Sequence, residues 1–355
     1  MDQPHISGTA VVITGGLLDS NSAKTAHGLI RVSDRFQIVG ILDEKHAGKD
    51  AGEVLDGKNR NLPIEKDIND FIAKHGKPKY AIIGMATKGG ILPKEFYPGI
   101  KMILSHGIHL VNGLHEPLAE IQEFKDVAYE FGDIIYDIRK SKPFRDLHFW
   151  TGKVKEITSL RIGVLGTDCA LGKRTTSRML EDELTQKGHK AEMIYTGQTG
   201  WMQGAGYGFL FDATPNDFIS GEIEHALYEC WKNNNPEVLI VEGQSGLRNP
   251  SGPCGSEFII SGALDGVILQ HSPIRVKFKG MEDYPSDIPD ILDEVELIEK
   301  LGSKVIALSI NTHKMEKDDV EAYRKELSAR TSLPIVFPFF DPLDGLVKAI
   351  LSLKK

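Results

Sequence analysis

Short apolar runs rich in β-branched residues alternate with amphipathic segments along most of the chain, and this alternation limits the folds that it can adopt. Runs that are apolar at nearly every position are typical of strands covered by helices on both faces, as in parallel sheets. The runs that we predict to be strands are TAVVIT, FQIVGIL, YAIIGMA, HLVNGL, DIIYDI, RIGVLG, AEMIYTG, EVLIVEG, GVILQH, KVIALSI and LPIVFPF. The segments that we predict to be helices include 23–32, 94–105, 116–130, 175–187, 217–232 and 287–301. The pattern predicts an α/β protein with mostly parallel sheets.

A charged and aromatic stretch, RKSKPFRDLHFWTGKVKEIT, divides these runs into two groups. It covers about residues 139–158 and has no clear periodicity, which is typical of a linker between domains. A chain of 355 residues is long enough for two domains that each bury a core. We therefore predict a Rossmann-like domain over residues 1–145 and a second domain over residues 146–355.

The composition excludes several classes of protein. The formal net charge is −8 and no dense basic cluster occurs, so we expect no nucleic-acid partner. No run approaches the roughly 18 apolar residues that a membrane helix needs, and the N-terminus lacks the pattern of a secretory signal. The cysteines, Cys169, Cys230 and Cys254, are odd in number and lack CxxC spacing, so we expect reduced thiols and assign no metal ligands. We expect a cytoplasmic homo-oligomer that acts on a small molecule.

A glycine-containing loop lies between a predicted strand and a predicted helix, in the sequence GVLGTDCALGKRTTSRML at residues 163–180. Gly166 can form a tight exit from the strand, and Gly172 allows backbone N–H groups to approach an anion. The N-terminus of the following helix and the ammonium group of Lys173 add positive charge. We predict a site for a phosphate or diphosphate group, formed by Gly166, Thr167, Asp168, Gly172, Lys173, Arg174, Thr175 and Thr176.

The spacing of this loop, G-T-x-x-x-x-G-K, resembles the loop of dethiobiotin synthetase and related P-loop ligases. The run VLIVEGQSGL contains Glu242 followed by glycine, and those ligases also carry an acidic residue and a glycine beside the phosphates. Arg174 is a departure, because a mononucleotide loop has a serine or threonine there to hold magnesium, and a guanidinium cannot ligate a metal. Either Thr175 or Thr176 supplies the hydroxyl, or the site holds phosphates without a metal, as a ligand such as coenzyme A would allow.

Seven segments spread along the chain carry a resemblance to one family. They are AKTAHGLIR, DEKHAGKDAGEVLDG, VNGLHEPL, GTDCALGKRTT, TGQTGWM, DFISGEIE and VEGQSGL. Together they resemble the D-glutamate N-acetyltransferase-like family, formerly a domain of unknown function with a Rossmann-like N-terminal part and a P-loop C-terminal part. The resemblance extends from about Thr9 to Phe339. It implies a P-loop NTPase-like C-terminal domain and transfer of an acetyl group from acetyl-CoA to the amine of D-glutamate.

Acetyl transfer requires a base for the amine and a hydrogen-bond donor for the oxyanion that develops on the thioester. The candidate catalytic residues are His27, His115, Asp168, Glu242 and His271. Arginine binds carboxylates with two parallel hydrogen bonds, so Arg31, Arg248 and Arg275 could hold a carboxylate of the substrate. We choose Arg275, which lies four residues after His271. Gln198 and Thr199 are candidate substrate contacts, and they lie in a glycine-rich stretch at 196–208 that we predict to be a flexible loop.

Two other functions fit the same phosphate loop. An ATP-dependent ligase or kinase that resembles dethiobiotin synthetase would use ATP with magnesium. A nucleotide-binding protein without catalysis would need only the phosphate site. The segment TGGLLDSNSAKTAHG lacks the GxGxxG spacing, so we assign no dinucleotide to the first domain.

Overall fold

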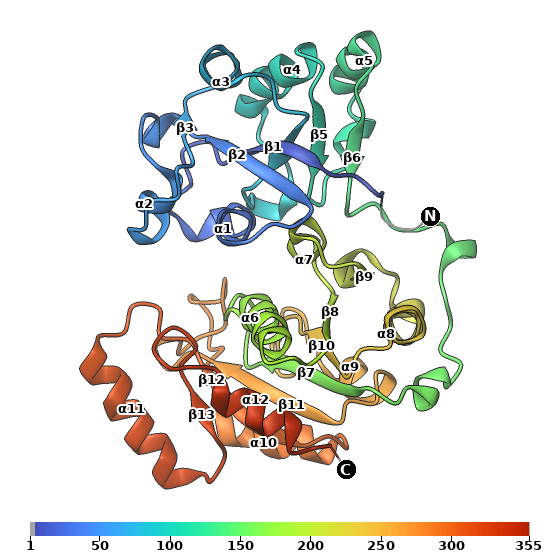
Figure 1. Cartoon of the computed structure of the whole chain (residues 1–355), viewed down its shortest axis with the longest axis vertical. Coiled ribbons are helices and arrows are strands. Elements are labelled where there is room, and N and C mark those ends of the chain that lie inside the picture. The colour runs from blue at the N-terminus through green and yellow to red at the C-terminus, as the bar shows by residue number, and fades with distance from the viewer. Residues whose placement is uncertain (1–3, 355) are drawn as a thin grey trace. The chain divides into compact units, whose positions relative to one another are not determined.

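The computed structural model describes residues 4–354, and contacts within the chain divide it into two units. Unit 1 consists of the chain up to Asp146 together with Gln198–Gly204, and unit 2 consists of Leu147–Gly197 and Ala205–Lys355. Each unit contains one sheet whose paired strands are all parallel (Figure 1). The predicted α/β class with two mostly parallel sheets is confirmed.

Unit 1 contains a six-stranded sheet in the order β3-β2-β1-β4-β5-β6, which is the order of a Rossmann fold. Its strands are β1 (Gly8–Ile13), β2 (Phe36–Leu42), β3 (Ile64–Glu65), β4 (Tyr80–Ile83), β5 (His109–Asn112) and β6 (Ile135–Asp137). Its α-helices are α1 (Lys24–Arg31), α2 (Ala51–Asp56), α3 (Ile68–His75), α4 (Tyr97–Ser105), α5 (Gln122–Phe131) and α7 (Gln198–Gln203). The Rossmann-like prediction for the first part of the chain is confirmed.

The sheet of unit 1 is covered on both faces, which explains the uninterrupted apolar sequences of its strands. One face, which includes Val11 and Ile83, forms a core with apolar side chains of α3, α4 and α5. On the other face, the ring of Phe36 packs against that of Trp201 from α7, with the ring centroids 6.3 Å apart. Figure 1 shows α3, α4 and α5 on one side of this sheet and α1 and α7 on the other.

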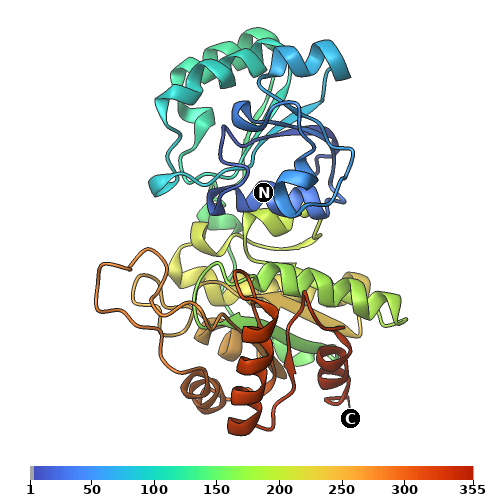
Figure 2. The same cartoon turned by 90° about the vertical axis from the view of Figure 1, so that its left-hand side faces the viewer.

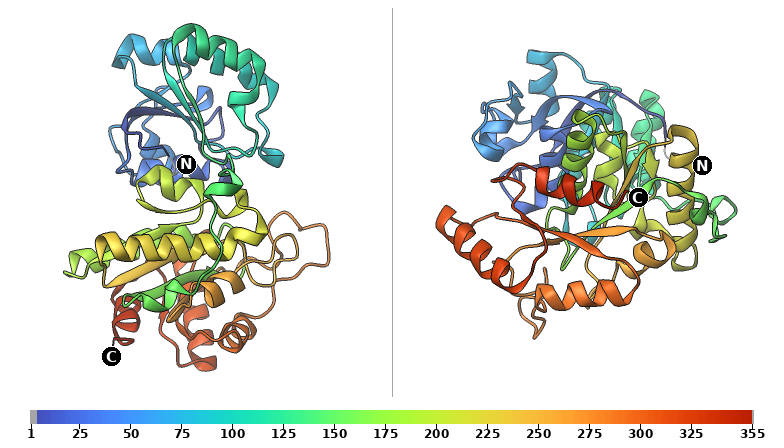
Figure 3. Two further views of the ribbon diagram at one scale, coloured as in Figure 1. Left: turned by 90° about the vertical axis from the view of Figure 1, so that its right-hand side faces the viewer. Right: turned by 60° about the horizontal axis from the view of Figure 1, so that its bottom comes forward.

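Unit 2 contains a seven-stranded sheet in the order β13-β12-β11-β7-β10-β8-β9. Its strands are β7 (Leu160–Gly166), β8 (Ala191–Tyr195), β9 (Tyr207–Gly208), β10 (Val238–Glu242), β11 (Gly266–His271), β12 (Val305–Ile310) and β13 (Ile335–Val336). Its α-helices are α6 (Lys173–Gln186), α8 (Asn216–Asn234), α9 (Ser256–Ser261), α10 (Ile291–Lys300), α11 (Lys317–Arg330) and α12 (Asp344–Leu351). One face of the sheet packs on α6 and α12, and the other packs on α8, α9, α10 and α11 (Figure 3, right).

The prediction of a flexible loop over residues 196–208 is wrong, because this stretch contains α7 and β9. Trp201 of α7 is 2% exposed. The side-chain amide of Gln203 donates to the carbonyl oxygens of Gly28 and Val32 at 2.9 and 3.0 Å. A helix of six residues is too short to be stable alone, so packing against α1 and β2 stabilises it. The predicted division of the chain between residues 145 and 146 does not include this feature, in which α7 lies in the second part of the sequence but belongs to unit 1.

The segment that enters unit 2 is held by two buried carboxylates of α8. The backbone N–H of His148 donates to Glu222 Oε1 at 3.0 Å, and that of Thr151 donates to Glu224 Oε2 at 2.6 Å. Gly221 lies so close to this segment that a Cβ atom there would be 1.9 Å from the carbonyl oxygen of His148. Figure 3, left, shows the segment (green) passing α8 (yellow). The stretch predicted to be a linker is therefore fixed to unit 2 from residue 148 onward.

Candidate functional site

The predicted phosphate loop follows β7, the central strand of the unit 2 sheet, and leads into α6. The strands β11 and β10 flank β7, so the residues after all three strands meet at the carboxyl edge, where α/β sheets bind ligands. Gly172 has a φ of 104° and Ala170 a φ of 55°, so the loop turns through left-handed conformations. Within the described part of the chain, no backbone carbonyl accepts a hydrogen bond from the N–H groups of residues 168–172. These groups and the N-terminus of α6 are suited to binding an anion.

Lys173, the first residue of α6, is buried against the loop. Its Nζ donates to the carbonyl oxygens of Asp168 and Ser245, both at 2.7 Å. Burial lowers the pKa of Lys173 to about 8, and the acidic groups around it only partly oppose this effect. Two neutral carbonyl groups therefore position the ammonium, and its charge can act on an anion in the loop.

Asp168 and Arg275, predicted as a catalytic residue and as a substrate ligand, are in contact. Arg275 Nη1 donates to Asp168 Oδ2 at 3.0 Å and to the carbonyl oxygen of Cys169 at 2.7 Å. Asp168 is fully buried and also accepts hydrogen bonds from Asn249 Nδ2 at 2.8 Å and from the backbone N–H of Lys279 at 2.9 Å. Both carboxylate oxygens are engaged. Asp168 thus ties the loop to the segment between β11 and α10, which projects from unit 2 in Figure 2 (orange).

Glu242 ends β10, beside the loop. Its Oε2 accepts hydrogen bonds from the backbone N–H groups of Thr196 and Gly197 at 3.0 and 3.3 Å. Burial raises the pKa of the Glu242 carboxyl, and the Thr196 N–H and the cations of Arg174 and Lys173 oppose this effect. Glu242, the acidic residue identified from the sequence, therefore interacts electrostatically with Lys173 and Arg174, the first two residues of α6.

His271 ends β11, on the other side of β7. Its Nδ1 lies 2.9 Å from Oγ1 of Thr167, the first residue after β7, so the two side chains share a hydrogen bond. Burial lowers the pKa of His271 to about 4, which keeps the imidazole neutral near pH 7. A neutral imidazole can accept a proton, so the chemistry of a base is possible at this point of the site.

The hydroxyl groups at the start of α6 differ in direction. Thr176 Oγ1 donates to Gln270 Oε1 of β11 at 2.8 Å, and both side chains are buried. Ser177 Oγ donates to the carbonyl oxygen of Lys173, one turn earlier, at 3.0 Å. Thr176 therefore binds the sheet, whereas Thr175 is partly exposed.

The other two candidate histidines belong to unit 1. His27 lies on α1, and its Nε2 is 2.6 Å from the carbonyl oxygen of Leu18. His115 follows β5 and lies against Gly90, where a Cβ atom would come within 2.5 Å of the imidazole ring. Unit 2 thus brings together Asp168, Glu242 and His271 around the loop, while His27 and His115 lie in unit 1.

Gln198 and Thr199 open α7 and contact other residues of unit 1. Gln198 Oε1 accepts a hydrogen bond from Arg139 Nη2 at 2.7 Å. The hydroxyls of Thr199 and Thr25 are hydrogen-bonded at 2.9 Å. The polar side chains predicted to contact substrate are therefore joined to α1 and to the residues that follow β6.

Sequence reasoning missed several residues that shape the loop. Asn249 donates a hydrogen bond to Asp168 of the loop, and Gln270 accepts one from Thr176 of α6. The carbonyl oxygen of Ser245 accepts a hydrogen bond from Lys173. Ser245 and Asn249 follow Glu242 closely along the chain, so the polar stretch after that acid was the available signal. Gln270 precedes the candidate His271 but has no distinguishing pattern.

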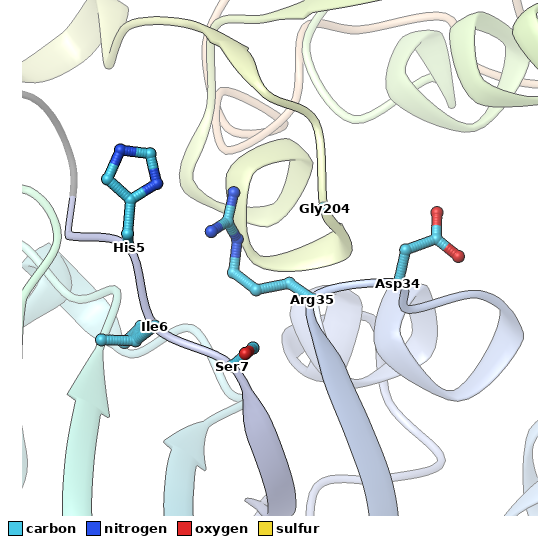
Figure 4. Close-up of a pocket in the computed structure, with 6 residues that line it drawn as sticks. All are labelled: His5, Ile6, Ser7, Asp34, Arg35 and Gly204. Atoms are coloured by element: carbon cyan, nitrogen blue, oxygen red, sulfur yellow. The ribbon is translucent and has the colours of Figure 1, made fainter.

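A pocket of about 260 Å³ in unit 1 is lined by His5, Ile6, Ser7, Asp34, Arg35 and Gly204 (Figure 4). Ser7 and Arg35 directly precede β1 and β2, so the pocket lies at the amino edge of the sheet. Arg35 stacks over the ring of Trp201 at 4.3 Å, and its Nε donates to the Trp201 carbonyl oxygen at 2.7 Å. The carboxyl edge is the ligand-binding edge of such sheets, so this pocket is not a candidate active site.

No cluster of three or more His, Cys, Asp or Glu side chains that could hold a metal occurs among residues 4–354. In the same range, no helix is both long and apolar enough to cross a membrane. The side chains of Cys169, Cys230 and Cys254 are free thiols.

Comparisons with known proteins agree with this architecture. Two curated relatives are both named D-glutamate N-acetyltransferase. The one from Tritonibacter scottomollicae is 29% identical over 326 residues, which cover 88% of this chain and 92% of the relative. The one from Pseudoalteromonas sp. is 28% identical over 276 residues, which cover 76% of this chain and 80% of the relative. The resemblance identified from the sequence motifs is confirmed.

A crystal structure of a DUF1611 family protein from Anabaena variabilis matches with a TM-score of 0.88 and 27% identity, covering 97% of this chain and 99% of that one. Two family models also match. The model described as a domain of unknown function, DUF1611_N Rossmann-like domain, matches residues 44–141. The model described as a domain of unknown function, DUF1611_C P-loop domain, matches residues 148–347, more than half of the chain. The protein therefore belongs to the DUF1611 family, with a Rossmann-like N-terminal part and a P-loop C-terminal part.

Proposed function

We propose that the protein is an N-acetyltransferase that moves an acetyl group from acetyl-CoA to the amine of an amino acid, with D-glutamate as the acceptor. The observation that carries the proposal is the similarity, along 88% of the chain, to a relative named D-glutamate N-acetyltransferase. The loop after β7 supports it, because its N–H groups and Lys173 suit the diphosphate of coenzyme A. In this proposal the phosphates serve only to bind the cofactor, and the reaction takes place at the thioester.

In the proposed reaction, the amine attacks the thioester carbonyl, a C–N bond forms and the C–S bond breaks. Coenzyme A leaves as a thiol after it takes up the proton that the amine has lost. We propose His271 as the base, because it is neutral and hydrogen-bonded to Thr167 of the loop. A pKa of about 4 makes it a weak base, but an amine that has attacked a carbonyl is far more acidic than a free ammonium. His27 and His115 stay candidates for the same role.

For the acceptor, we propose Arg275, Gln198 and Thr199 as substrate contacts. The guanidinium of Arg275 has five N–H groups, so the contacts of its Nη1 with Asp168 and Cys169 leave donors for a carboxylate. We further propose that the protein is cytoplasmic and that it forms a homo-oligomer, and most soluble oligomers are homo-oligomers with closed symmetry.

The proposal is tested by following thiol release from acetyl-CoA in the absence of ATP, with a panel of D- and L-amino acids. We expect release with D-glutamate and an N-acetylated product detected by mass spectrometry. If no amino acid of the panel releases thiol, the proposed acetyl transfer is wrong.

An ATP-dependent ligase or kinase is the second candidate, favoured by the G-T-x-x-x-x-G-K loop together with the buried acid Glu242 beside it. This reading requires binding of ATP with magnesium, which calorimetry measures directly. A protein that binds nucleotide without catalysis would show binding in that experiment but no product with any substrate.

A further inference from the structure

A P-loop that binds a magnesium nucleotide holds the metal with the hydroxyl that follows its lysine and with an acid from a neighbouring strand. The corresponding residues of this chain are Arg174, which follows Lys173, and Glu242, which ends β10. The surroundings of these two residues decide whether magnesium fits.

The hydroxyl position does not fit magnesium. The guanidinium of Arg174 has five donors and no acceptor, so it cannot ligate a cation. The first buried hydroxyl along α6 is that of Thr176, and it donates to Gln270 Oε1 at 2.8 Å. Thr175 is rotated from Arg174 by one residue of a helix that has 3.6 residues per turn, about 100°, so its hydroxyl does not take the same place.

One oxygen of the acidic residue is already hydrogen-bonded. Glu242 Oε2 accepts hydrogen bonds from the backbone N–H groups of Thr196 and Gly197 at 3.0 and 3.3 Å. Arg174 and Lys173 both act electrostatically on this carboxylate. A divalent cation placed beside Glu242 would be repelled by Arg174 and Lys173, the two cations that already act on this carboxylate.

We propose that Arg174 replaces the magnesium ion, so that Arg174 and Lys173 together neutralise the diphosphate of the ligand and the site binds it without a metal. A guanidinium binds phosphate oxygens with two parallel hydrogen bonds, which gives direction as well as charge. The inference rests on the part of the proposed function that seats a diphosphate in the loop, and not on acetyl transfer. It also defines the class of ligand. A diphosphate that already carries magnesium should bind more weakly, because the metal has neutralised part of its charge, whereas a diphosphate diester such as coenzyme A needs no metal at this site.

The test is calorimetry on the full-length protein with three probes, coenzyme A, ADP and inorganic diphosphate, each in EDTA and in excess magnesium. For the unmodified protein we expect coenzyme A to bind equally well in both conditions and ADP to bind more weakly with magnesium. Arg174→Ala should weaken all three probes by roughly ten- to hundredfold in EDTA. Arg174→Thr, which restores the hydroxyl, should make the binding of ADP depend on magnesium.

The matched control is Arg178→Ala, one turn further along α6, where the arginine pairs with Glu181 and Asp182. We expect this variant to bind all three probes as the unmodified protein does. Thermal unfolding of each variant checks that a loss of binding is not a loss of fold.

The inference is overturned if EDTA abolishes binding to the unmodified protein, or if folded Arg174→Ala keeps full affinity. Binding of ADP or diphosphate in EDTA without binding of coenzyme A would support the inference and contradict the acetyltransferase proposal. Thiol release that requires magnesium would support the acetyltransferase proposal and contradict the inference. If none of the probes binds, the loop is not a diphosphate site and both are wrong.

Discussion

At the scale of single residues, the electrostatics of the loop depend on which buried charges have a counter-ion. Lys173 is buried with carbonyl groups as its hydrogen-bond partners, whereas Asp168 is buried with Arg275 as its counter-ion. A buried cation is costly unless an anion compensates it, so an anionic ligand that binds beside Lys173 gains favourable free energy. The charge that matters for a ligand is thus on Lys173, and not on Asp168.

The substitution Lys173→Met, which keeps the length and removes the charge, should weaken the binding of coenzyme A by roughly ten- to hundredfold. In the unmodified protein the pKa of Lys173 lies near 8, so the lysine is charged below this pH and neutral above it. Affinity should therefore fall as the pH rises through about 8, and binding above that pH should take up a proton. Calorimetry in buffers of different ionisation enthalpy measures both effects. A flat profile of affinity against pH would contradict the role of Lys173.

The substitution His271→Ala should lower kcat for acetyl transfer by roughly 10²- to 10⁴-fold, because it removes the proposed base. The affinity for coenzyme A should change little. Since the pKa of His271 is lowered to about 4, the imidazole is neutral at all higher pH values. The profile of kcat/KM should therefore show no inflection between about pH 5.5 and 7.5, where an ordinary histidine titrates. An inflection in that range would contradict the assignment of His271 as the base.

At the scale of secondary-structure elements, α8 and α7 each fix a segment that has little regular structure of its own. Glu224 of α8 accepts hydrogen bonds from Thr151 and from the backbone N–H of Val154. The short helix α7 contributes Trp201 to the packing of unit 1. The positions of both segments depend on contacts between elements that lie far apart along the chain.

The substitution Glu224→Gln should lower the free energy of unfolding of unit 2 by about 1–3 kcal/mol. Burial raises the pKa of Glu224, but hydrogen bonds from Thr151 and Val154 outweigh it, so the pKa lies below its ordinary value. The carboxylate therefore stabilises the fold above the pKa of the unfolded chain, and this stability is lost as the pH falls through the lower, folded value. Hydrogen exchange of residues 151–154 measures the loosening, with Glu229→Gln on the same helix as the control. Unchanged exchange in Glu224→Gln would contradict the prediction.

The substitution Trp201→Ala should destabilise unit 1 by about 3–5 kcal/mol, because it leaves a cavity beside Phe36 and removes the stacking with Arg35. Denaturant unfolding, with hydrogen exchange to locate the change, measures the effect. Trp150→Ala is a suitable control, since Trp150 is 42% exposed and belongs to unit 2. Equal effects of the two substitutions would show that Trp201 has no special role in unit 1.

At the scale of the whole molecule, the chain passes between the two units three times, after residues 146, 197 and 204. The first unit is therefore incomplete without seven residues supplied by the second part of the sequence. Because these seven residues belong to unit 1, the chain connects the two units at two places besides the linker.

A protease site inserted at Phe144, which is 72% exposed, should give two fragments that stay together under native conditions. The C-terminal fragment supplies α7, whose Thr199 and Gln203 hydrogen-bond to α1. Gel filtration should therefore elute both fragments in one peak, and denaturant should separate them. The same cleavage in Trp201→Ala should let the fragments separate more readily. Separation of the unmodified fragments in native buffer would contradict this prediction.

The sequence was sufficient for the class of fold and for most strands, because buried parallel strands are recognisable from local composition. The run FQIVGIL coincides with β2, and GVILQH coincides with β11. By contrast, LPIVFPF contains only the two-residue β13, since Pro334 and Pro338 cannot donate to the hydrogen-bond ladder. The position of the phosphate loop also followed from local sequence, since it needs only a strand, glycines, a lysine and a helix start.

Only the tertiary structure decided how the loop is held and what its residues can do. Asp168 meets Asn249 and Arg275, which are 81 and 107 residues away along the chain, and Thr176 meets Gln270, 94 residues away. These contacts depend on the order β11-β7-β10 in the sheet, and the sequence of any one strand does not specify its neighbours. The physical reason is that hydrogen-bond partners and burial are properties of the assembled core, whereas periodicity and glycine spacing are properties of the local chain.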